Sequence, residues 1–132
     1  MNPLPFPLSL ILRGMLDAAI NEHPAASALT LNFKDPSYSP EHGGYHPVEI
    51  RLERRKECWH LAYITDFAYY GPPGFAELEK EIDFDFNAGV GYLPWMGEQP
   101  LARLKALYQC WEANFLTYCQ MEVYTLNVTM EM

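Results

Sequence analysis

Two stretches of the sequence repeat their apolar residues at the spacing of an amphipathic helix. The first, 8–22, has apolar side chains three and four residues apart and ends before Pro24, which cannot continue a helix. The second begins at Pro100, a residue suited to the first turn of a helix, and runs to about 119. Its apolar stripe consists of Leu101, Leu104, Tyr108, Trp111, Phe115 and Tyr118. Both stretches are predicted to pack one face against a sheet.

Alternating apolar and polar residues predict β-strands between and after these helices. The predicted strands are 29–34, 47–54, 58–69, 81–93 and 121–130. A short charged tip joins the second strand to the third, which favours a β-hairpin. The fourth strand is unusually long, and Gly89 and Gly91 within it indicate a bulge or a bend.

The element order α-β-β-β-β-α-β, with connections of the hairpin type, favours an α+β fold. We expect a single antiparallel sheet of about five to seven strands, flanked by an N-terminal and a C-terminal helix. A flat and a strongly curved sheet are both compatible with this pattern. The 132 residues show no internal repeat and no linker, and this length is typical of one domain. Residues 1–132 are therefore predicted to form a single domain.

The composition supports a folded core and argues against nucleic acid as a partner. Apolar residues make up 49% of the chain and aromatic residues 14%, which is more than a disordered chain carries. The net charge of −8 offers no basic face for phosphates, and the one basic cluster, 54–56, is flanked by glutamates. The acidity instead favours solubility or a basic partner.

The cysteines and the hydropathy pattern are typical of a reduced, cytoplasmic protein. The three cysteines include no Cys-x-x-Cys pair, so a zinc site of the usual spacing is not expected, and the thiols are predicted to be reduced and buried. The N-terminal segment lacks the basic start and the uninterrupted apolar run of a secretion signal. No run of about 18 apolar residues exists, so neither a membrane span nor a membrane partner is predicted.

The loop 35–46 is the first candidate for chemistry, because it contains His42 and His46 with two glycines between them. Two histidines four residues apart can share a metal ion on a helix, but the glycines argue against a helix here. A loop site would need a carboxylate, and the metal alternative is formed by His42, His46 and Asp66. The simpler interpretation is a turn with solvent-facing histidines and no cofactor.

A ladder of carboxylates is the second candidate. Glu81, Asp83 and Asp85 alternate along the predicted strand 81–93 and would lie on one face, about 6.6 Å apart. Such a ladder can hold a cation, raise the pKa of a carboxyl group for acid–base work, or present charge to a basic partner. The simplest interpretation is the solvated face of a half-buried sheet.

Aromatic residues in turns are the third candidate. The set, all in or beside predicted turns, consists of Tyr38, Tyr45, Tyr69, Tyr70 and Trp95. Exposed aromatic side chains at such places anchor partner proteins or further subunits. The simpler alternative is that these rings close the ends of the core.

These features support two functional hypotheses. The first is a non-enzymatic binding or assembly protein, with a protein partner or self-association as a homo-oligomer, an acidic sheet face and an aromatic loop surface. Its candidate binding residues are Tyr38, His42, Tyr45, His46, Glu81, Asp83, Asp85 and Trp95. The alternative is a small metal-dependent or acid–base enzyme, whose side chains would converge within about 5 Å. That set consists of His42, His46, Asp66, Asp83 and Asp85.

Four segments, spread over nearly the whole chain, resemble a known family. They are FKDPSYSPEHGGYHPVEIRLE, YITDFAYYG, EIDFDFNAGVGY and LYQCWEANFLTYCQMEVY. The family is the bacterial domain of unknown function 2787, which implies no activity and no catalytic residues. Its fold is similar to that of the acidic mitochondrial matrix glycoproteins, which are ring-forming, multi-ligand binding proteins. The resemblance implies a curved antiparallel sheet flanked by helices, and self-association. The predicted strand 121–130 departs from that fold.

Overall fold

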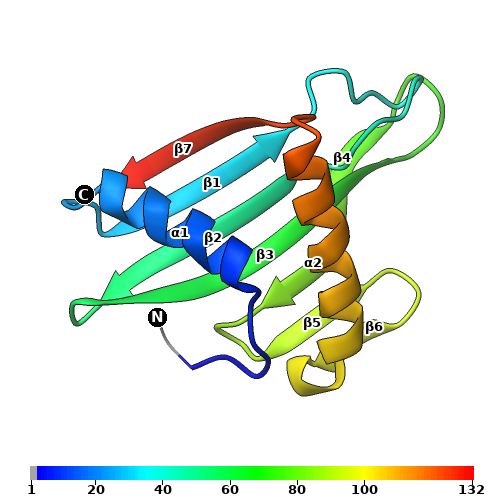
Figure 1. Cartoon of the computed structure of the whole chain (residues 1–132). Coiled ribbons are helices and arrows are strands. Elements are labelled where there is room, and N and C mark those ends of the chain that lie inside the picture. The colour runs from blue at the N-terminus through cyan, green and yellow to red at the C-terminus, as the bar shows by residue number, and fades with distance from the viewer. Residues whose placement is uncertain (1–2) are drawn as a thin grey trace.

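The computed structural model describes residues 3–132, which form one seven-stranded antiparallel sheet with two α-helices across one of its faces (Figure 1). The strand order is β6-β5-β4-β3-β2-β1-β7. The elements are α1 (Leu10–Glu22), β1 (Ala28–Lys34), β2 (Val48–Arg55), β3 (Cys58–Tyr70), β4 (Glu77–Asp85), β5 (Val90–Leu93), β6 (Gly97–Pro100), a 3₁₀ turn (Leu101–Arg103), α2 (Lys105–Gln120) and β7 (Thr125–Glu131). The predicted α+β class, with an antiparallel sheet flanked by an N-terminal and a C-terminal helix, is confirmed.

The hydrophobic core lies between the two helices and the sheet face that they cover. β1 shows how the sequence builds it, because Leu29, Leu31 and Phe33 are at most 4% exposed and alternate with more exposed residues. In the register with β2, Leu31 lies opposite Ile50 and Leu29 opposite Leu52, so apolar side chains of adjacent strands lie side by side. The helices contribute Leu12, Leu16, Ala19, Tyr108, Trp111 and Phe115. Within residues 3–132 no helix is long and apolar enough to cross a membrane.

A buried carboxylate connects the two helices. Ser9 is the N-cap of α1, and its hydroxyl accepts a hydrogen bond from the backbone N–H of Leu12 at 3.1 Å. The backbone N–H of Ser9 in turn donates to both carboxylate oxygens of Glu112, each at 3.2 Å. Glu112, only 7% exposed, also accepts a 2.7 Å hydrogen bond from the hydroxyl of Tyr108. The start of α1 is thereby fixed to the middle of α2.

The predicted strand 81–93 is in fact two strands, β4 and β5, joined by a tight turn over 86–89. Gly89 adopts a φ of 74°, a left-handed conformation that glycine accepts at little cost. The backbone N–H of Ala88 donates to the Oδ1 atom of Asp85 at 3.0 Å and closes the turn. Gly89 and Gly91, which were predicted to mark a bulge or a bend within one strand, therefore belong to a complete hairpin.

The helix predicted for 100–119 starts later than expected, because another strand comes first. Pro100 is the last residue of β6, which pairs with β5 at the edge of the sheet. A 3₁₀ turn follows, and α2 begins at Lys105. The order is α-β-β-β-β-β-β-α-β, with six strands before α2 where the pattern predicted four. The strand predicted after α2 is present as β7, and it pairs with β1.

A β-bulge between β3 and β4 changes the side on which Glu81 lies. Asp66 pairs with Ile82, but the next residue, Phe67, pairs with Lys80, so Glu81 has no partner in the register. An extra residue in one strand interrupts the alternation of sides. Glu81 consequently lies on the helix-covered face together with Ile82, where both line a cavity.

The predicted one-faced ladder of Glu81, Asp83 and Asp85 is therefore wrong. Asp83 follows the regular alternation on the far side of the bulge and lies on the helix-free face, where it accepts a hydrogen bond from Thr65. Asp85 is two residues further along the same strand and shares that face. The cause is the local register between two strands, which cannot be read from β4 alone.

The predicted burial of the cysteines is also wrong. Cys58 and Cys110 are exposed and Cys119 is half-buried, and all three are free thiols. Cys58 is the first residue of β3, beside the hairpin tip, and Cys110 lies between the buried positions of α2. Burial raises the pKa of the Cys119 thiol to about 11, so this thiol is protonated at neutral pH.

Candidate functional site

A cavity of about 310 Å³ opens on the helix-covered side of the sheet, beside the C-terminal half of α2. It is formed by the loop before β2, the middle of β3, the bulged part of β4, α2 and the segment that leads into β7. Its lining residues are Gly44, Tyr45, His46, Val48, Asp66, Glu81, Ile82, Trp111, Asn114, Phe115, Tyr118 and Tyr124. Apart from tyrosine hydroxyls, its ionisable groups are the two carboxylates of Asp66 and Glu81 and the imidazole of His46. These lining residues include no lysine or arginine.

Three ionisable side chains converge on this cavity. The Nδ1 atom of His46 lies 2.7 Å from the Oε2 atom of Glu81 and 3.2 Å from the Oδ1 atom of Asp66. One ligand-type atom from each of the three residues lies within 4.8 Å of the others. Asp66 is 9% exposed, and its Oδ2 atom accepts a 3.2 Å hydrogen bond from the indole nitrogen of Trp111. The cluster combines a deep carboxylate with two groups that reach solvent.

The loop 35–46 is held in shape by Asp35. Its Oδ1 atom accepts hydrogen bonds from the backbone N–H and the hydroxyl of Ser37, and its Oδ2 atom accepts one from the backbone N–H of Tyr45 at 3.0 Å. These bonds, led by the Ser37 hydroxyl, lower the pKa of Asp35. Gly44 has a φ of 137°, and a Cβ atom there would lie 2.8 Å from the Asp35 carboxylate. Glycine is thus required next to the residues that enter the cavity.

The two carboxylates favour a charged imidazole. The hydrogen bond to Asp66, aided by the charges of Asp66 and Glu81, raises the pKa of His46 against the opposing effect of burial. The backbone oxygen of His46 accepts a 3.2 Å hydrogen bond from the hydroxyl of Tyr124, which fixes the main chain at this point. The histidine is therefore positioned from both sides, by its side-chain partners and by its backbone.

The structure separates the candidate residues of the sequence into several places. Tyr45, His46 and Glu81 line the cavity, and Tyr38 lies beside it, with its ring centroid 5.5 Å from that of His46. His42 is exposed in the loop and does not line the cavity.

Trp95 is 70% exposed in the turn between β5 and β6. The predicted convergence of five enzyme residues fails, because Asp83 and Asp85 lie on the opposite face of the sheet from His46 and Asp66.

Trp111, Asn114 and Tyr124 are parts of the cavity that sequence reasoning missed, because the helical stripe and the strand pattern assign the aromatic residues to the core. One signal was available in the sequence. Asp66 shares the strand phase of Ile64, which points into the core, and a carboxylate at a core position requires partners. The tryptophan is one of those partners.

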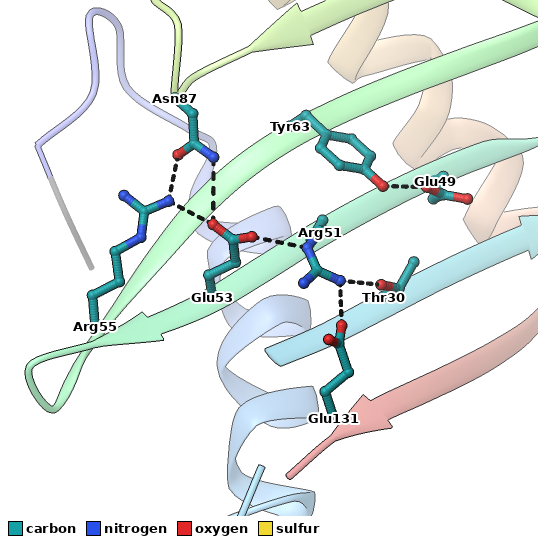
Figure 2. A network of polar contacts seen from close by, with 8 residues as sticks. All are labelled: Thr30, Glu49, Arg51, Glu53, Arg55, Tyr63, Asn87 and Glu131. Carbon is teal, nitrogen blue, oxygen red and sulfur yellow. Dashed lines mark hydrogen bonds and ion pairs between the residues drawn. The ribbon is translucent and has the colours of Figure 1, made fainter. Parts of the chain in front are cut away.

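The helix-free face of the sheet carries a polar network centred on Arg51 (Figure 2). Its guanidinium donates to Glu53 at 2.9 Å, to Glu131 at 2.6 Å and to Thr30 at 3.1 Å, and so connects β2 with β1 and β7. Arg55 bonds the other oxygen of Glu53 at 2.5 Å. These two arginines lower the pKa of Glu53 to about 2. The cations of this network are already neutralised by its own carboxylates.

Replacing Glu53 by glutamine is expected to lower the free energy of unfolding by about 1–2 kcal/mol at pH 7. The pKa of about 2 lies below the ordinary value of 4.5, so this contribution is complete above about pH 5 and is lost as the pH falls toward 2. Urea unfolding at pH 7, 4 and 3 measures it, with Glu22→Gln on the exposed side of α1 as control. A pH-independent difference between wild type and Glu53→Gln would contradict this prediction.

Other carboxylates on the same face form no ion pair among the residues that the structure describes. Glu49 accepts a hydrogen bond from the hydroxyl of Tyr63, and the Oδ1 atom of Asp83 accepts one from the hydroxyl of Thr65 at 2.6 Å. Burial raises the pKa of Asp83, although the Thr65 hydroxyl and the charge of Lys80 oppose the shift. These carboxylates have hydroxyl donors but no cationic partner in contact.

The register places these groups in a row across the sheet. Glu49 lies opposite Thr65, which lies opposite Asp83. Asp83 lies opposite Tyr92, and Tyr92 lies opposite Glu98 on the edge strand β6. Cross-strand neighbours on one face have their Cβ atoms about 5 Å apart. An exposed tyrosine therefore stands between two carboxylates at the β6 end of the helix-free face.

Two solved structures are similar to the chain over almost its full length. The hypothetical protein VC0508 from the VSP-II pathogenicity island of Vibrio cholerae is 36% identical, covers 98% of each chain and has a TM-score of 0.86. The conserved hypothetical protein VC1805 from pathogenicity island VPI-2 of Vibrio cholerae is 39% identical, covers 97% of this chain and 98% of its own, and has a TM-score of 0.85. The latter is described as sharing structural homology with the human P32 protein.

The family comparison gives the same assignment. No curated protein matches the sequence. The family described as "Protein of unknown function (DUF2787)" matches residues 7–130. The predicted resemblance is confirmed, and it brings no activity with it. With the fold, the full-length similarity and this match in agreement, the chain belongs to the DUF2787 family.

Proposed function

We propose that the protein is a non-enzymatic binding protein whose helix-free sheet face recognises a basic segment of a partner protein. The observation that carries this proposal is the cross-strand row Asp83, Tyr92 and Glu98, which puts an exposed aromatic ring between two carboxylates. Tyr92 is 39% exposed, and neither helix lies on this face. The surface is therefore open to a partner along the row.

The row suits an arginine or lysine side chain. A guanidinium can form hydrogen bonds with a carboxylate while its flat face lies on an aromatic ring, and a cation over a tyrosine contributes about 0.5–1 kcal/mol at an exposed site. Asp83 and Glu98 supply carboxylates on either side of the Tyr92 ring. Glu49 and Asp85 extend the negative charge along neighbouring positions of the same face. Several cations spaced along one peptide can thus be bound together.

The two arginines of this face and the net charge favour the same kind of partner. Arg51 and Arg55, which also lie on this face, are held in ion pairs with Glu53 and Glu131 and so do not neutralise the row. The net charge of −8 attracts cations and speeds their encounter at low salt. Binding that relies on exposed charges weakens as ionic strength rises, because salt screens such charges.

A ten-residue peptide of alternating arginine and glycine tests the proposal. We expect calorimetry to show binding in about 50 mM salt that weakens strongly in about 500 mM salt. The double variant Asp83→Asn with Glu98→Gln is expected to bind roughly fivefold to tenfold more weakly, because two ion pairs at the protein surface are removed. A peptide with glutamine in place of arginine is expected not to bind.

The matched control is the double variant Asp17→Asn with Glu22→Gln, which removes the same charge from exposed positions of α1. It is expected to bind the arginine peptide within about twofold of wild type, since it changes only long-range attraction. Absence of binding in 50 mM salt would overturn the proposal. An equal loss in the α1 control would also overturn it, because affinity would then reflect net charge rather than the row.

A further inference from the structure

We propose that His46, Asp66 and Glu81 form a binding site for a divalent transition metal ion, of which Zn²⁺ and Co²⁺ are suitable representatives. One imidazole nitrogen and two carboxylate oxygens are ligands that such ions accept, whereas Mg²⁺ and Ca²⁺ prefer all-oxygen sites. This site opens on the helix-covered face of the sheet, away from the row proposed to bind a basic partner, and the two proposals stand independently.

The distances between the donor atoms suit one shared ion. The ligand atoms of the three residues lie within 4.8 Å of one another, and the closest pair, His46 Nδ1 and Glu81 Oε2, is 2.7 Å apart. An ion with bonds of about 2.0–2.2 Å holds its ligand atoms about 3–3.5 Å apart. Small rotations of the side chains would therefore bring all three atoms into contact with one ion, which would lie between His46 Nδ1 and the two carboxylates.

The three ligands come from segments that are each fixed by their own contacts. His46 ends the loop that Asp35 organises, and its backbone oxygen is bonded by Tyr124. Asp66 lies in the middle of β3. Glu81 enters the site only because it is the unpaired residue of the β4 bulge. Bulges redirect single side chains and occur often beside functional sites.

The second oxygen of each carboxylate, which does not face His46, accepts a hydrogen bond from a residue outside the cluster. The indole N–H of Trp111 donates to Asp66 Oδ2 at 3.2 Å, and the hydroxyl of Tyr70 donates to Glu81 Oε1 at 3.2 Å. Such outer contacts orient the ligand atoms toward a metal ion. The opposite oxygen of each carboxylate, together with His46 Nδ1, remains directed at the common point.

The cavity leaves room for a further ligand on the ion. Three protein ligands leave a tetrahedral ion with one open position, and sites with one open position admit water or a further ligand. The adjoining volume of about 310 Å³ is large enough for several water molecules and is lined in part by Asn114 and Tyr118. An ion bound here would be reached from solvent through this cavity.

Titration of the protein with ZnCl₂ and CoCl₂ at pH 7.5 tests the proposal. The measurement uses the Cys58→Ser, Cys110→Ser background, because these exposed thiols can bind the same ions. Calorimetry is expected to show one ion per chain. His46→Ala and Glu81→Gln are each expected to weaken binding at least about tenfold, because a ligand is lost from a three-ligand site. His42→Ala, an exposed histidine of the same loop, is the matched control and is expected to bind like the parent.

A second readout reports where the ion is bound. The indole N–H of Trp111 contacts Asp66 directly, so bound Co²⁺, which is paramagnetic, is expected to shift or broaden that proton resonance in the NMR spectrum. The same resonance in Glu81→Gln, which also verifies that the variant is folded, is expected to stay unperturbed at equal Co²⁺. The proposal is overturned if neither ion binds, if His46→Ala or Glu81→Gln binds like the parent, or if the indole resonance is unaffected at saturation.

Discussion

The substitution Phe115→Ala is expected to lower the free energy of unfolding by about 3–5 kcal/mol. The Phe115 ring is 2% exposed and packs among other aromatic rings. It stacks on Trp111 with centroids 5.1 Å apart and meets Phe33 edge-on at 5.0 Å. Alanine would remove this buried area and leave a void that rigid rings cannot close, so transfer and cavity costs add. Urea unfolding followed by tryptophan fluorescence and circular dichroism measures the loss.

The matched control for this substitution is Phe75→Ala. Phe75 is 80% exposed in the turn between β3 and β4, so the same chemical change is expected to alter stability by less than about 0.5 kcal/mol. Phe115 also lines the cavity, so its removal would enlarge the volume next to His46. A loss below about 1 kcal/mol for Phe115→Ala would show that the aromatic cluster can collapse around the void.

The substitution Glu112→Ala is expected to cost about 3 kcal/mol of folding free energy. Glu112 is 7% exposed and accepts hydrogen bonds from Tyr108 at 2.7 Å and from the Ser9 backbone at 3.2 Å. Its removal leaves a buried hydroxyl and the first backbone N–H at the start of α1 without an acceptor, and each unsatisfied donor costs about 1–3 kcal/mol. Because the contact with Ser9 fixes the start of α1, its first turn is expected to exchange amide hydrogens faster.

A double-mutant cycle separates the two halves of this contact. Tyr108→Phe removes only the hydroxyl, so it is expected to cost less than Glu112→Ala, and the two substitutions together are expected to cost less than their sum. Glu22→Ala, an exposed glutamate in the last turn of α1, is the control and is expected to be nearly neutral. Additive costs would show that the Tyr108 hydroxyl and Glu112 are not coupled, and normal exchange at the start of α1 would show that Glu112 does not connect the helices.

The sequence singled out most of the ionisable residues of the cavity but grouped them only partly as the structure does. His46 and Asp66 were placed together in the metal alternative, and they are in contact at 3.2 Å. His42, however, was added to that set by spacing, and Glu81 was assigned with Asp83 by alternation. Both rules describe one segment in isolation. The observed cluster joins residues from three segments, and its geometry depends on how the loop folds over β3 and how β3 registers with β4.

The aromatic residues also show that a pattern within one segment does not predict contacts between segments. Trp111 was predicted as core, and its ring is indeed 8% exposed, but its indole nitrogen also holds the deepest carboxylate of the cavity. A helical stripe tells which side of α2 faces the sheet. It does not tell which polar atom of the sheet lies beneath a given ring, because that follows from the crossing of helix and sheet.

The helix-free face was predicted as acidic, and the prediction holds for Asp83 and Asp85 but not for Glu81. The row that the structure adds, with Tyr92 between Asp83 and Glu98, was hidden because 81–93 was interpreted as one strand. Once Gly89 reverses the chain, Tyr92 returns beside Asp83 instead of extending away from it.

By itself the sequence determined the α+β class, the amphipathic helices, the hairpin of β2 and β3 and the strand after α2, because these depend on periodicity and turn residues that act locally. Only the tertiary structure decided the bulge at Glu81, the hairpin of β4 and β5, the exposure of Cys58 and Cys110, and the meeting of His46 with two carboxylates. The physical reason is that strand register and loop packing are set by contacts between residues far apart in the chain. A shift of one residue then transfers a side chain to the other face of the sheet.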